Sequence, residues 1–421
     1  MAIVATLWSG AASAATVDVR AGRLIDPSSA RVLTDQRIRI VDGRIAEVSG
    51  WRDADGPASI DWSTKTVLPG LIDLHTHIAD GSIDAAAAND PADPLKTSEA
   101  RRILKAVPAA KTMLRAGFTA VRDVGVYRGL TDIALRDAIE AGEIEGPRMF
   151  VAGGYITTPG GGGDIDALAH DIPLPETFHV GVVHNPAEAR DRARYLLDHG
   201  ADFIKLIATG AVLALGSEPG ALELSPEEMK AACDEAKLRG SYCIAHAHGA
   251  EGIKAAIRAG ARTIEHASYL DAEGIALAKK SGVWLDMDIY NGDWIEEVGT
   301  RQGWPAEYLR KNRETTDVQR RGFAAAVKAG AKLTFGTDAA VYPYGLGGRQ
   351  FAYMVRYGMT PMQAIQSATM EAARALRMDG KVGTLAPGAY GDLVAVTGDP
   401  LTDIRTLERV DGVIKEGKLI R

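Results

Sequence analysis

Short apolar runs alternate with longer amphipathic stretches through most of the 421-residue chain. The pattern predicts strands at residues 67–75, 119–125, 148–154, 203–209, 242–248, 263–268, 283–289 and 332–338. Helical patterns lie between nearly all of these runs, and several end in glycine, as at Ala259-Gly260, which permits a left-handed helix cap. Regular alternation of strands and helices predicts an α/β fold, a (β/α)8 TIM barrel, with a doubly wound open sheet as the alternative.

Both ends of the chain have a different sequence pattern, in which short runs of alternating apolar and polar residues are bounded by glycine turns. Residues 16–66 contain TVDVRAGRLID and QRIRIVDGRIAEVSG, and residues 380–421 contain GDLVAVTGD and DGVIKEGKLI. Asp42-Gly43 stands between two alternating runs and is typical of a hairpin turn. We therefore expect one small β-sandwich domain built from both termini, beside a barrel that spans residues 67–379.

Composition excludes some classes of partner. The chain is 46% hydrophobic and 24% charged, as in ordinary globular proteins, and its net charge of −7 argues against nucleic acid or an anionic membrane surface. No apolar run approaches the roughly 20 residues of a membrane span. Cys233 and Cys243 are too few for a disulfide framework, and we expect two buried small residues.

Residues 1–15, MAIVATLWSGAASAA, combine an apolar stretch with a small-residue pattern that is similar to a signal-peptidase site. A basic leading region is absent, so we predict a truncated signal peptide, with a disordered tail as the alternative. A signal peptide would make the protein periplasmic or secreted. Without one, a cytoplasmic location is expected.

Chemically active side chains gather where the predicted strands end. These residues are His75, His77, Lys205, His246, His266 and Asp338. In a barrel, the carboxyl ends of the strands meet at one mouth, and functional residues lie there. His75 and His77 are two apart on a strand and face the same side, where two imidazoles can bind a divalent ion. A hydrogen-bonded pair of core histidines is the alternative.

Lys205 lies inside an apolar strand, where a lysine is costly to bury unless it is paired or modified. Desolvation makes the amine nucleophilic, and reaction with CO2 would give a carbamate, N6-carboxylysine, that bridges two metals. The alternatives are a lysine whose amine reaches solvent, or an ion pair with Asp123 or Asp338. Asp123 ends the second strand and could instead support a histidine or Lys205.

Two neighbouring divalent ions would lower the pKa of a shared water, and the resulting hydroxide would attack an amide carbonyl polarised by one metal. Asp338 is our candidate for the general base that then protonates the leaving nitrogen. His and carboxylate ligands suit Zn²⁺, the metal we expect, and also Mn²⁺ or Co²⁺.

At this point the chain resembles the amidohydrolase superfamily. The segment PGLIDLHTH, Lys205, the later histidines and the Asp of GTD match its pattern in order, and the early GRLIDP and late APGAYGDLVAV resemble its flanking β-sandwich. The resemblance implies His75, His77 and Asp338 on one metal, with His246 and His266 on the other and carboxylated Lys205 as the bridge. The spacing from Lys205 in the family favours His246 as the metal ligand. His248 would then support the site or contact the substrate as a further catalytic residue.

Within the superfamily the chain is similar to the imidazolonepropionase-related branch, which includes Xaa-Pro dipeptidase-like carboxypeptidases and ochratoxin-hydrolysing amidases. The dipeptidase-like members carry a Gly-Gly-His-Gly-Asp loop after strand 3, whereas this chain has TTPGGGGD, with Gly162 in the place of the histidine. The change removes a polarising group, is expected to leave space, and favours a bulkier amide. The resemblance thus implies hydrolysis of N-acyl amino acids, including ochratoxin A to ochratoxin alpha and phenylalanine.

Three alternatives remain at this stage: an Xaa-Pro dipeptidase, a cyclic-amide hydrolase of the imidazolonepropionase type, and a barrel with a vestigial metal site. The intact ligand set argues against the last. The resemblance also implies a homo-oligomer, with an octamer as one form.

Candidate substrate contacts come from three segments. Gly162 and Gly163 belong to a glycine run that lacks phosphate-loop spacing and is typical of an active-site loop. Aromatic residues between 284 and 308, Tyr290 among them, could line an apolar pocket or pack between helix and barrel. Tyr344 and Arg349 follow Asp338, and an arginine there could hold a substrate carboxylate or remain in solvent.

Overall fold

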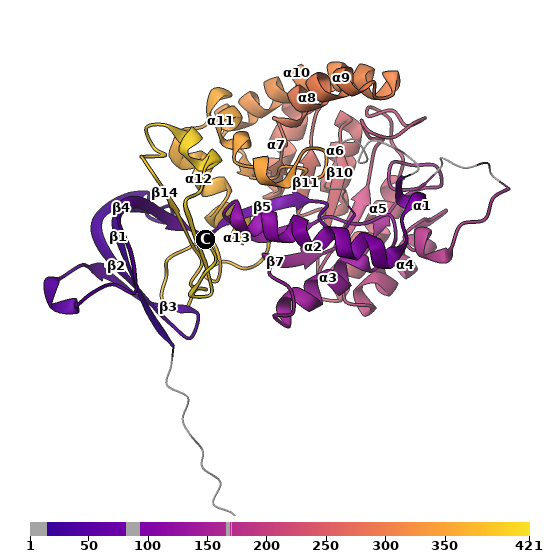
Figure 1. Cartoon of the computed structure of the whole chain (residues 1–421). Helices are drawn as coiled ribbons and strands as arrows, with labels where there is room; N and C mark the ends of the chain where they lie inside the picture. The colour runs from indigo at the N-terminus through magenta and orange to yellow at the C-terminus, as the bar shows by residue number, and fades with distance from the viewer. Residues whose placement is uncertain (1–14, 81–92, 166–168, 170) are drawn as a thin grey trace, which may run out of the picture.

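The structure is a computed structural model that describes residues 15–80, 93–165, 169 and 171–421 (Figure 1). Residues 1–14, most of the predicted signal segment, lie outside the described residues. In the described part of the chain, every helix is too short or too polar to cross a membrane.

Strands from both ends of the chain join in a single seven-stranded sheet, on the left of Figure 1. Its strands, in the spatial order β16-β15-β14-β4-β1-β2-β3, are β1 (Thr16–Asp26), β2 (Arg31–Val41), β3 (Arg44–Gly50), β4 (Ile60–Pro69), β14 (Leu393–Val396), β15 (Gly412–Lys415) and β16 (Lys418–Leu419). The two ends meet where β14 pairs antiparallel with β4, with Leu393 opposite Pro69. The predicted hairpin is present, since Asp42 and Gly43 connect β2 to β3 with positive φ angles of 47° and 76°.

Parallel strands and helices alternate through the middle of the chain, which confirms the α/β class. The strands are β5 (Leu71–Thr76), β6 (Phe118–Asp123), β7 (Arg148–Val151), β8 (Tyr155–Ile156), β9 (Ile204–Ile207), β10 (Cys243–Ala247), β11 (Thr263–His266), β12 (Trp284–Asp286) and β13 (Lys332–Thr334). They form a sheet β5-β6-β7 and a sheet β13-β12-β11-β10-β9-β8. The first and last strands are neighbours, because Leu74 N–H donates to Phe335 O (2.9 Å) and Asp338 N–H donates to His75 O (2.8 Å).

Helices alternate with these strands along the chain. They are α1 (Asp93–Lys96), α2 (Glu99–Arg115), α3 (Thr131–Glu140), α4 (Pro186–Asp198), α5 (Pro226–Leu238), α6 (Ala250–Ala259), α7 (Ala272–Ser281), α8 (Asn291–Trp294), α9 (Thr300–Gln302), α10 (Ala306–Ala329), α11 (Arg349–Arg356), α12 (Pro361–Ser367) and α13 (Met370–Ala375). Short 3-10 turns are η1 (Asp53–Asp55), η3 (Glu176–Phe178), η5 (Tyr344–Leu346) and η6 (Ile404–Glu408), and η4 (Ile295–Gly299) is a π-helical turn.

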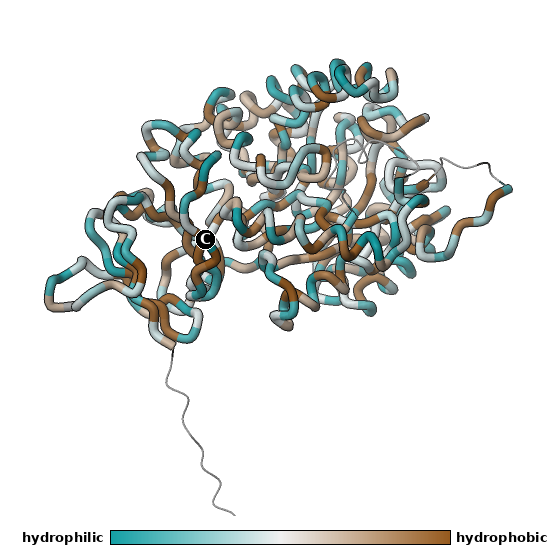
Figure 2. Tube along the Cα trace, in the orientation of Figure 1, coloured by the Kyte–Doolittle hydropathy of each residue, from teal (hydrophilic) through white to brown (hydrophobic). Residues whose placement is uncertain are grey.

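Local sequence explains where helices begin and end. Ser225 caps α5 as its sequence indicates, and Glu228 completes a reciprocal capping box. Gly260 ends α6 in the left-handed conformation, with φ 104°. Figure 2 shows the apolar segments gathered in the strands and many polar segments on the outer helices, as burial of one helix face requires.

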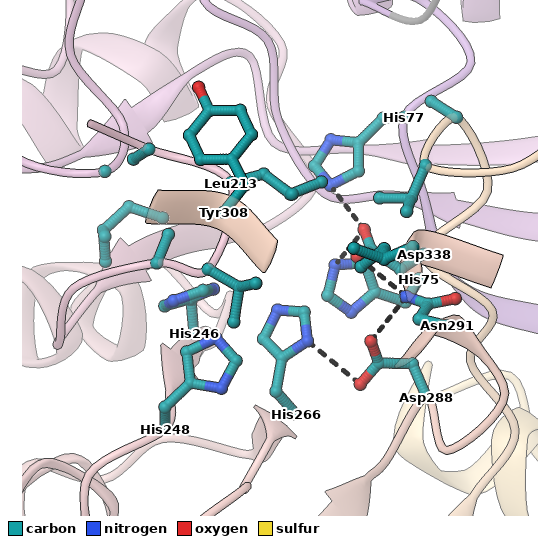
Figure 3. A pocket seen from close by; sticks show the side chains of 18 of the residues that line it. His75, His77, Leu213, His246, His248, His266, Asp288, Asn291, Tyr308 and Asp338 are labelled. Carbon is teal, nitrogen blue, oxygen red and sulfur yellow. Dashed lines mark hydrogen bonds and ion pairs between the residues drawn. The ribbon is translucent and has the colours of Figure 1, made fainter. Parts of the chain in front are cut away.

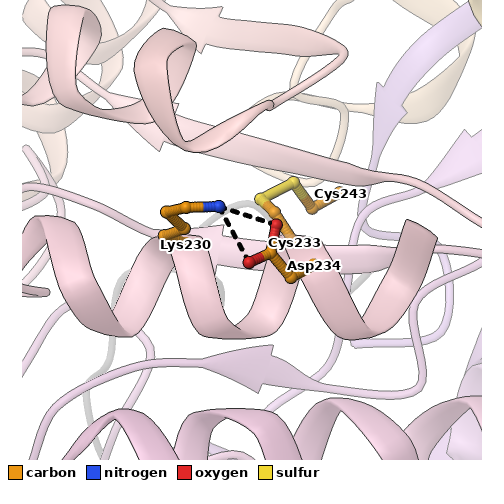
Figure 4. Close-up of a disulfide and its surroundings, with 4 residues drawn as sticks. All are labelled: Lys230, Cys233, Asp234 and Cys243. Carbon is orange, nitrogen blue, oxygen red and sulfur yellow. Dashed lines mark hydrogen bonds and ion pairs between the residues drawn. A yellow bond between two sulfur atoms is a disulfide. The ribbon is translucent and has the colours of Figure 1, made fainter. Parts of the chain in front are cut away.

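The two cysteines are joined in a disulfide, so the prediction of two separate small residues is wrong (Figure 4). Both side chains are buried, as expected. Helix α5 packs beside β10, which places the Cα atoms of Cys233 and Cys243 5.2 Å apart, within the range that a disulfide spans. Sequence spacing alone does not reveal this contact between helix and strand.

Candidate metal centre

The strand ends bring the predicted ligands to one cavity of about 250 Å³ (Figure 3). The residues that line it include His75, His77, Lys205, His246, His266 and Asp338. His75 lies on β5, Lys205 on β9, His246 on β10 and His266 on β11. His77 follows the end of β5, and Asp338 follows β13. His75 and Lys205 are each only 1% exposed, so these two side chains lie at the buried end of the cavity.

One carboxylate faces two of the imidazoles. Asp338 Oδ1 lies 3.4 Å from His75 Nε2 and 3.3 Å from His77 Nε2. Burial lowers the pKa of His75 to about 4. Burial alone would raise the pKa of Asp338, but the neighbouring imidazoles of His75 and His77 hold it below its usual range.

The second group contains both members of the histidine doublet. Potential ligand atoms of His246, His248 and His266 all lie within 4.8 Å of one another. His248 Nδ1 is 2.7 Å from Ser268 Oγ, and His246 Nε2 is 3.3 Å from Gly210 O. Each ring therefore keeps one nitrogen available, and the choice between His246 and His248 rests on the family spacing.

His266 and Asp338 hold unusual backbone conformations, with φ angles of 66° and 57°. Residues other than glycine rarely adopt this left-handed backbone conformation, which costs about 1–3 kcal/mol per residue. The strain turns both side chains toward the cavity at the points where their strands end. Sequence patterns carry no signal for it.

The side-chain amine of Lys205 is buried at the cavity. Within the described residues, its Nζ forms no ion pair or hydrogen bond, so the predicted pairing with Asp123 or Asp338 is absent there. Burial lowers its pKa to about 8. Asp123 instead accepts a hydrogen bond from Ala79 N–H (3.0 Å) and supports the loop after β5, not a metal ligand or Lys205.

A buried ionic network beneath the site is absent from the sequence-based prediction. Arg122 contacts both carboxylate oxygens of Glu265 (2.9 and 3.0 Å) and one of Asp286 (3.3 Å), and Glu265 Oε2 reaches His75 Nδ1 (3.2 Å). The cost of burying a charge, which singles out Lys205, applies equally to these charged residues in apolar strands. That signal could have revealed the network.

A second supporting network surrounds His266. Asp288 Oδ1 lies 3.0 Å from His266 Nδ1, and its other oxygen accepts from Asn291 Nδ2 (2.6 Å). Asn291 also donates to Asp338 Oδ2 (3.1 Å), so one amide links both groups (Figure 3). Burial opposes the charged form of His266, but Asp288 overrides this and raises its pKa.

Only part of the predicted substrate surface faces the cavity. Gly162 lines it, whereas Gly163, Tyr290, Tyr344 and Arg349 do not. Arg349 donates to Tyr290 Oη (2.9 Å), and Tyr344 Oη donates to His77 O (3.2 Å), so these side chains pack behind the wall.

Two further predictions concern the cavity wall. Of the aromatic residues predicted between 284 and 308, Tyr308 lines the cavity, while Trp304 packs in a cluster with Ile295 and Val298. At Gly162, which lines the cavity, an added Cβ would lie 3.0 Å from the Ala211 Cβ, which is a tight contact.

Comparisons with known proteins show the family of the chain. The Amidohydrolase family matches residues 66–420. Ochratoxinase of Aspergillus niger is 31% identical, covering 96% of this chain and 86% of that protein. A crystal structure of a Xaa-Pro dipeptidase with bound methionine is 37% identical over 96% of this chain and 99% of its own, with a TM-score of 0.87. The crystal structure of A. niger ochratoxinase has a TM-score of 0.85 at 29% identity, over 97% and 96% of the two chains.

Proposed function

Because the chain belongs to the amidohydrolase family and is a hydrolase of amide bonds, we propose that it uses two divalent metal ions to cleave N-acyl amino acids. The observation that carries the proposal is the convergence of His75, His77, His266 and Asp338 with a second histidine and Lys205 in one cavity. The fold brings these strand ends together, but it does not require side chains of the metal-binding type at five of them.

The donor set fits two divalent ions. His75, His77 and Asp338 would hold one ion, and His246 and His266 the other, because imidazole nitrogen and carboxylate oxygen suit Zn²⁺. Bound metal would polarise the substrate carbonyl and lower the pKa of a water molecule in the cavity.

We propose that Lys205 carries the ligand that joins the two metal sites. Its buried amine faces the cavity without an ion pair among the described residues. The ammonium group first loses one proton, and the free amine then forms a bond from Nζ to the carbon of CO2 and loses a second proton, which gives a carbamate anion. The product replaces an unpaired buried cation with two oxygen ligands, which suits a cavity that holds two cations.

Asp338 is positioned to move the proton. Its Oδ1 faces His75 and His77, while Asn291 fixes its Oδ2 by donating a hydrogen bond of 3.1 Å. We propose that Asp338 accepts a proton from the attacking water and delivers it to the leaving nitrogen. His248, held by Ser268, is available to contact the substrate carbonyl.

We propose ochratoxin A among the substrates, cleaved to ochratoxin alpha and phenylalanine. The similarity to ochratoxinase supports this choice, and apolar residues Leu213, Ile295 and Val341 in the cavity wall suit a bulky acyl group. Xaa-Pro dipeptides are the second candidate, favoured by the 37% identical dipeptidase.

Metal analysis joined to a substrate panel tests the proposal. The panel contains N-acyl-phenylalanines including ochratoxin A, Xaa-Pro dipeptides and small cyclic amides, with release of amino acid as the readout. We expect about two metal ions per chain and fastest release from the N-acyl-phenylalanines. Ring opening without amino-acid release would contradict the proposal.

We also propose that the parallel strands of residues 67–379 close into a (β/α)8 barrel and that the terminal sheet forms a β-sandwich. The hydrogen bonds between the first and last parallel strands support closure.

A periplasmic or secreted location is favoured by the disulfide, since such bonds persist in oxidising compartments. The proposed assembly is a homo-oligomer that binds neither nucleic acid nor membrane.

A further inference from the structure

The loop between β9 and α5 forms one wall of the cavity. Residues 211–215 of this loop line the cavity, and Leu213 packs against the cluster of Ile295, Val298 and Trp304. Tyr308, on α10, is 2% exposed and lines the same cavity. Figure 3 draws both Leu213 and Tyr308 among the side chains that line the cavity with the histidines, so both contribute apolar surface to it.

Polar contacts from α10 hold this loop. The side chain of Lys311 is fully buried and donates to Ala214 O (2.6 Å). Lys311 also pairs with Glu307 (2.5 Å), which accepts from Gly216 N–H (3.0 Å), and Arg310 donates to Glu218 (2.6 Å). Burying the charge of a lysine costs free energy unless it is paired. The hydrogen bond from Lys311 to a loop carbonyl therefore indicates that this contact holds the loop in a defined position.

The opposite side of the loop is fixed as well. Ser217 Oγ donates to Glu223 Oε1 (2.7 Å), and the other oxygen of Glu223 accepts from Gly162 N–H (2.9 Å). The loop therefore joins α10 to the glycine loop and cannot move without breaking charged hydrogen bonds. A wall held at both sides can discriminate between substrates by shape.

We propose that Leu213 and Tyr308 form a specificity wall that selects substrates with a bulky apolar or aromatic group beside the scissile amide, and that Lys311 is its positioning residue. This inference rests on the proposed amide hydrolysis. Arg102 is a cation that lines the cavity, and it is paired with Asp93 (3.0 Å). Its charge is therefore balanced within the protein, which is consistent with an apolar group of the substrate in this cavity.

The test compares two substrates, N-benzoyl-phenylalanine and N-acetyl-alanine, in the wild-type enzyme and in variants. Leu213→Ala should lower kcat/KM for the aromatic substrate about 10-fold or more, since apolar pockets discriminate on this scale, and change the small substrate little. Lys311→Met should raise KM for the aromatic substrate with a smaller effect on kcat, because the loop loses its position while the metal ligands stay in place. Metal content should be unchanged in both variants.

Lys254→Met is the matched control, since Lys254 is also buried and ion-paired, with Glu251 and Glu273, but does not line or hold the cavity. It should leave the ratio of the two kcat/KM values unaltered. Equal losses on both substrates in Leu213→Ala would overturn the specificity wall. This result decides the question even where Lys311→Met fails to fold. A wild-type enzyme that binds metal and cleaves no amide would instead overturn the proposed function, and the wall with it.

Discussion

The Oε2 atom of Glu265 lies 3.2 Å from the Nδ1 atom of His75, on the side of the ring away from the cavity. Nε2 of the same ring faces Asp338, so Glu265 is placed to orient a proposed ligand from behind. Glu265→Gln should weaken metal binding about 10- to 100-fold, as loss of such supporting carboxylates does elsewhere. Titration of the metal-free protein against a chromophoric chelator measures this effect without any assay of activity.

Glu235→Gln is a suitable control for that titration. Glu235 is also buried and paired with two arginines, Arg194 and Arg239, but it lies on α5 away from the cavity. If both variants bind metal as tightly as the wild-type protein, Glu265 has no role in positioning His75.

Lys205→Ala should abolish activity and the second metal ion, because the proposed carbamate supplies the ligand shared by both sites. Added short-chain carboxylic acids should restore part of the activity by occupying the space of the missing side chain. Metal content and turnover, measured with and without acetate or propionate, check both statements. A fully active Lys205→Ala protein with two bound metals would exclude the bridging role.

Asp338→Asn should separate metal binding from turnover. Asparagine keeps an oxygen near His75 and His77 but cannot accept the proton, so we expect kcat to fall by about 10²- to 10⁴-fold while much of the metal remains. Parallel metal analysis and kinetics on N-acyl-phenylalanine give the two values. Loss of metal in proportion to activity would show that Asp338 acts as a ligand alone.

The disulfide between Cys233 and Cys243 should stabilise the fold by restricting the unfolded chain. For a sequence separation of 10 residues, chain-entropy arguments give about 3 kcal/mol in the free energy of unfolding. Denaturant unfolding with and without reductant measures the difference. The variant with both cysteines replaced by alanine should not respond to reductant, and an equal response there would mean that the effect comes from elsewhere.

The amino-acid sequence predicts this fold well where periodicity determines structure. Alternating strands and helices indicate the parallel sheets, and the strand ends indicate which histidines meet, because topology brings those ends together. The same logic predicts the joining of both termini, which β14 and β4 complete.

Contacts that depend on packing between elements could not be predicted in this way. Arg349 meets Tyr290 behind the wall instead of facing the cavity, and Cys233 meets Cys243 across a helix and a strand. The left-handed backbone of His266 likewise has no pattern in the sequence. These features arise from the three-dimensional fit of neighbouring elements, which residue spacing does not encode.

Gly162 provides a test of how tightly the two cavity loops pack. Its backbone N–H is held by Glu223, and a Cβ at this position would lie 3.0 Å from the Ala211 Cβ, so a methyl group fits only if one loop shifts by a few tenths of an ångström. Gly162→Ala should lower the free energy of unfolding by about 1–3 kcal/mol, the usual effect of overpacking. Ala211→Gly in the same protein should restore most of the loss, since the colliding methyl group is then absent. Denaturant unfolding of the two single variants and the double variant gives the coupling between the positions. Additive effects would mean that the loops move apart freely and that a larger side chain could be accommodated here.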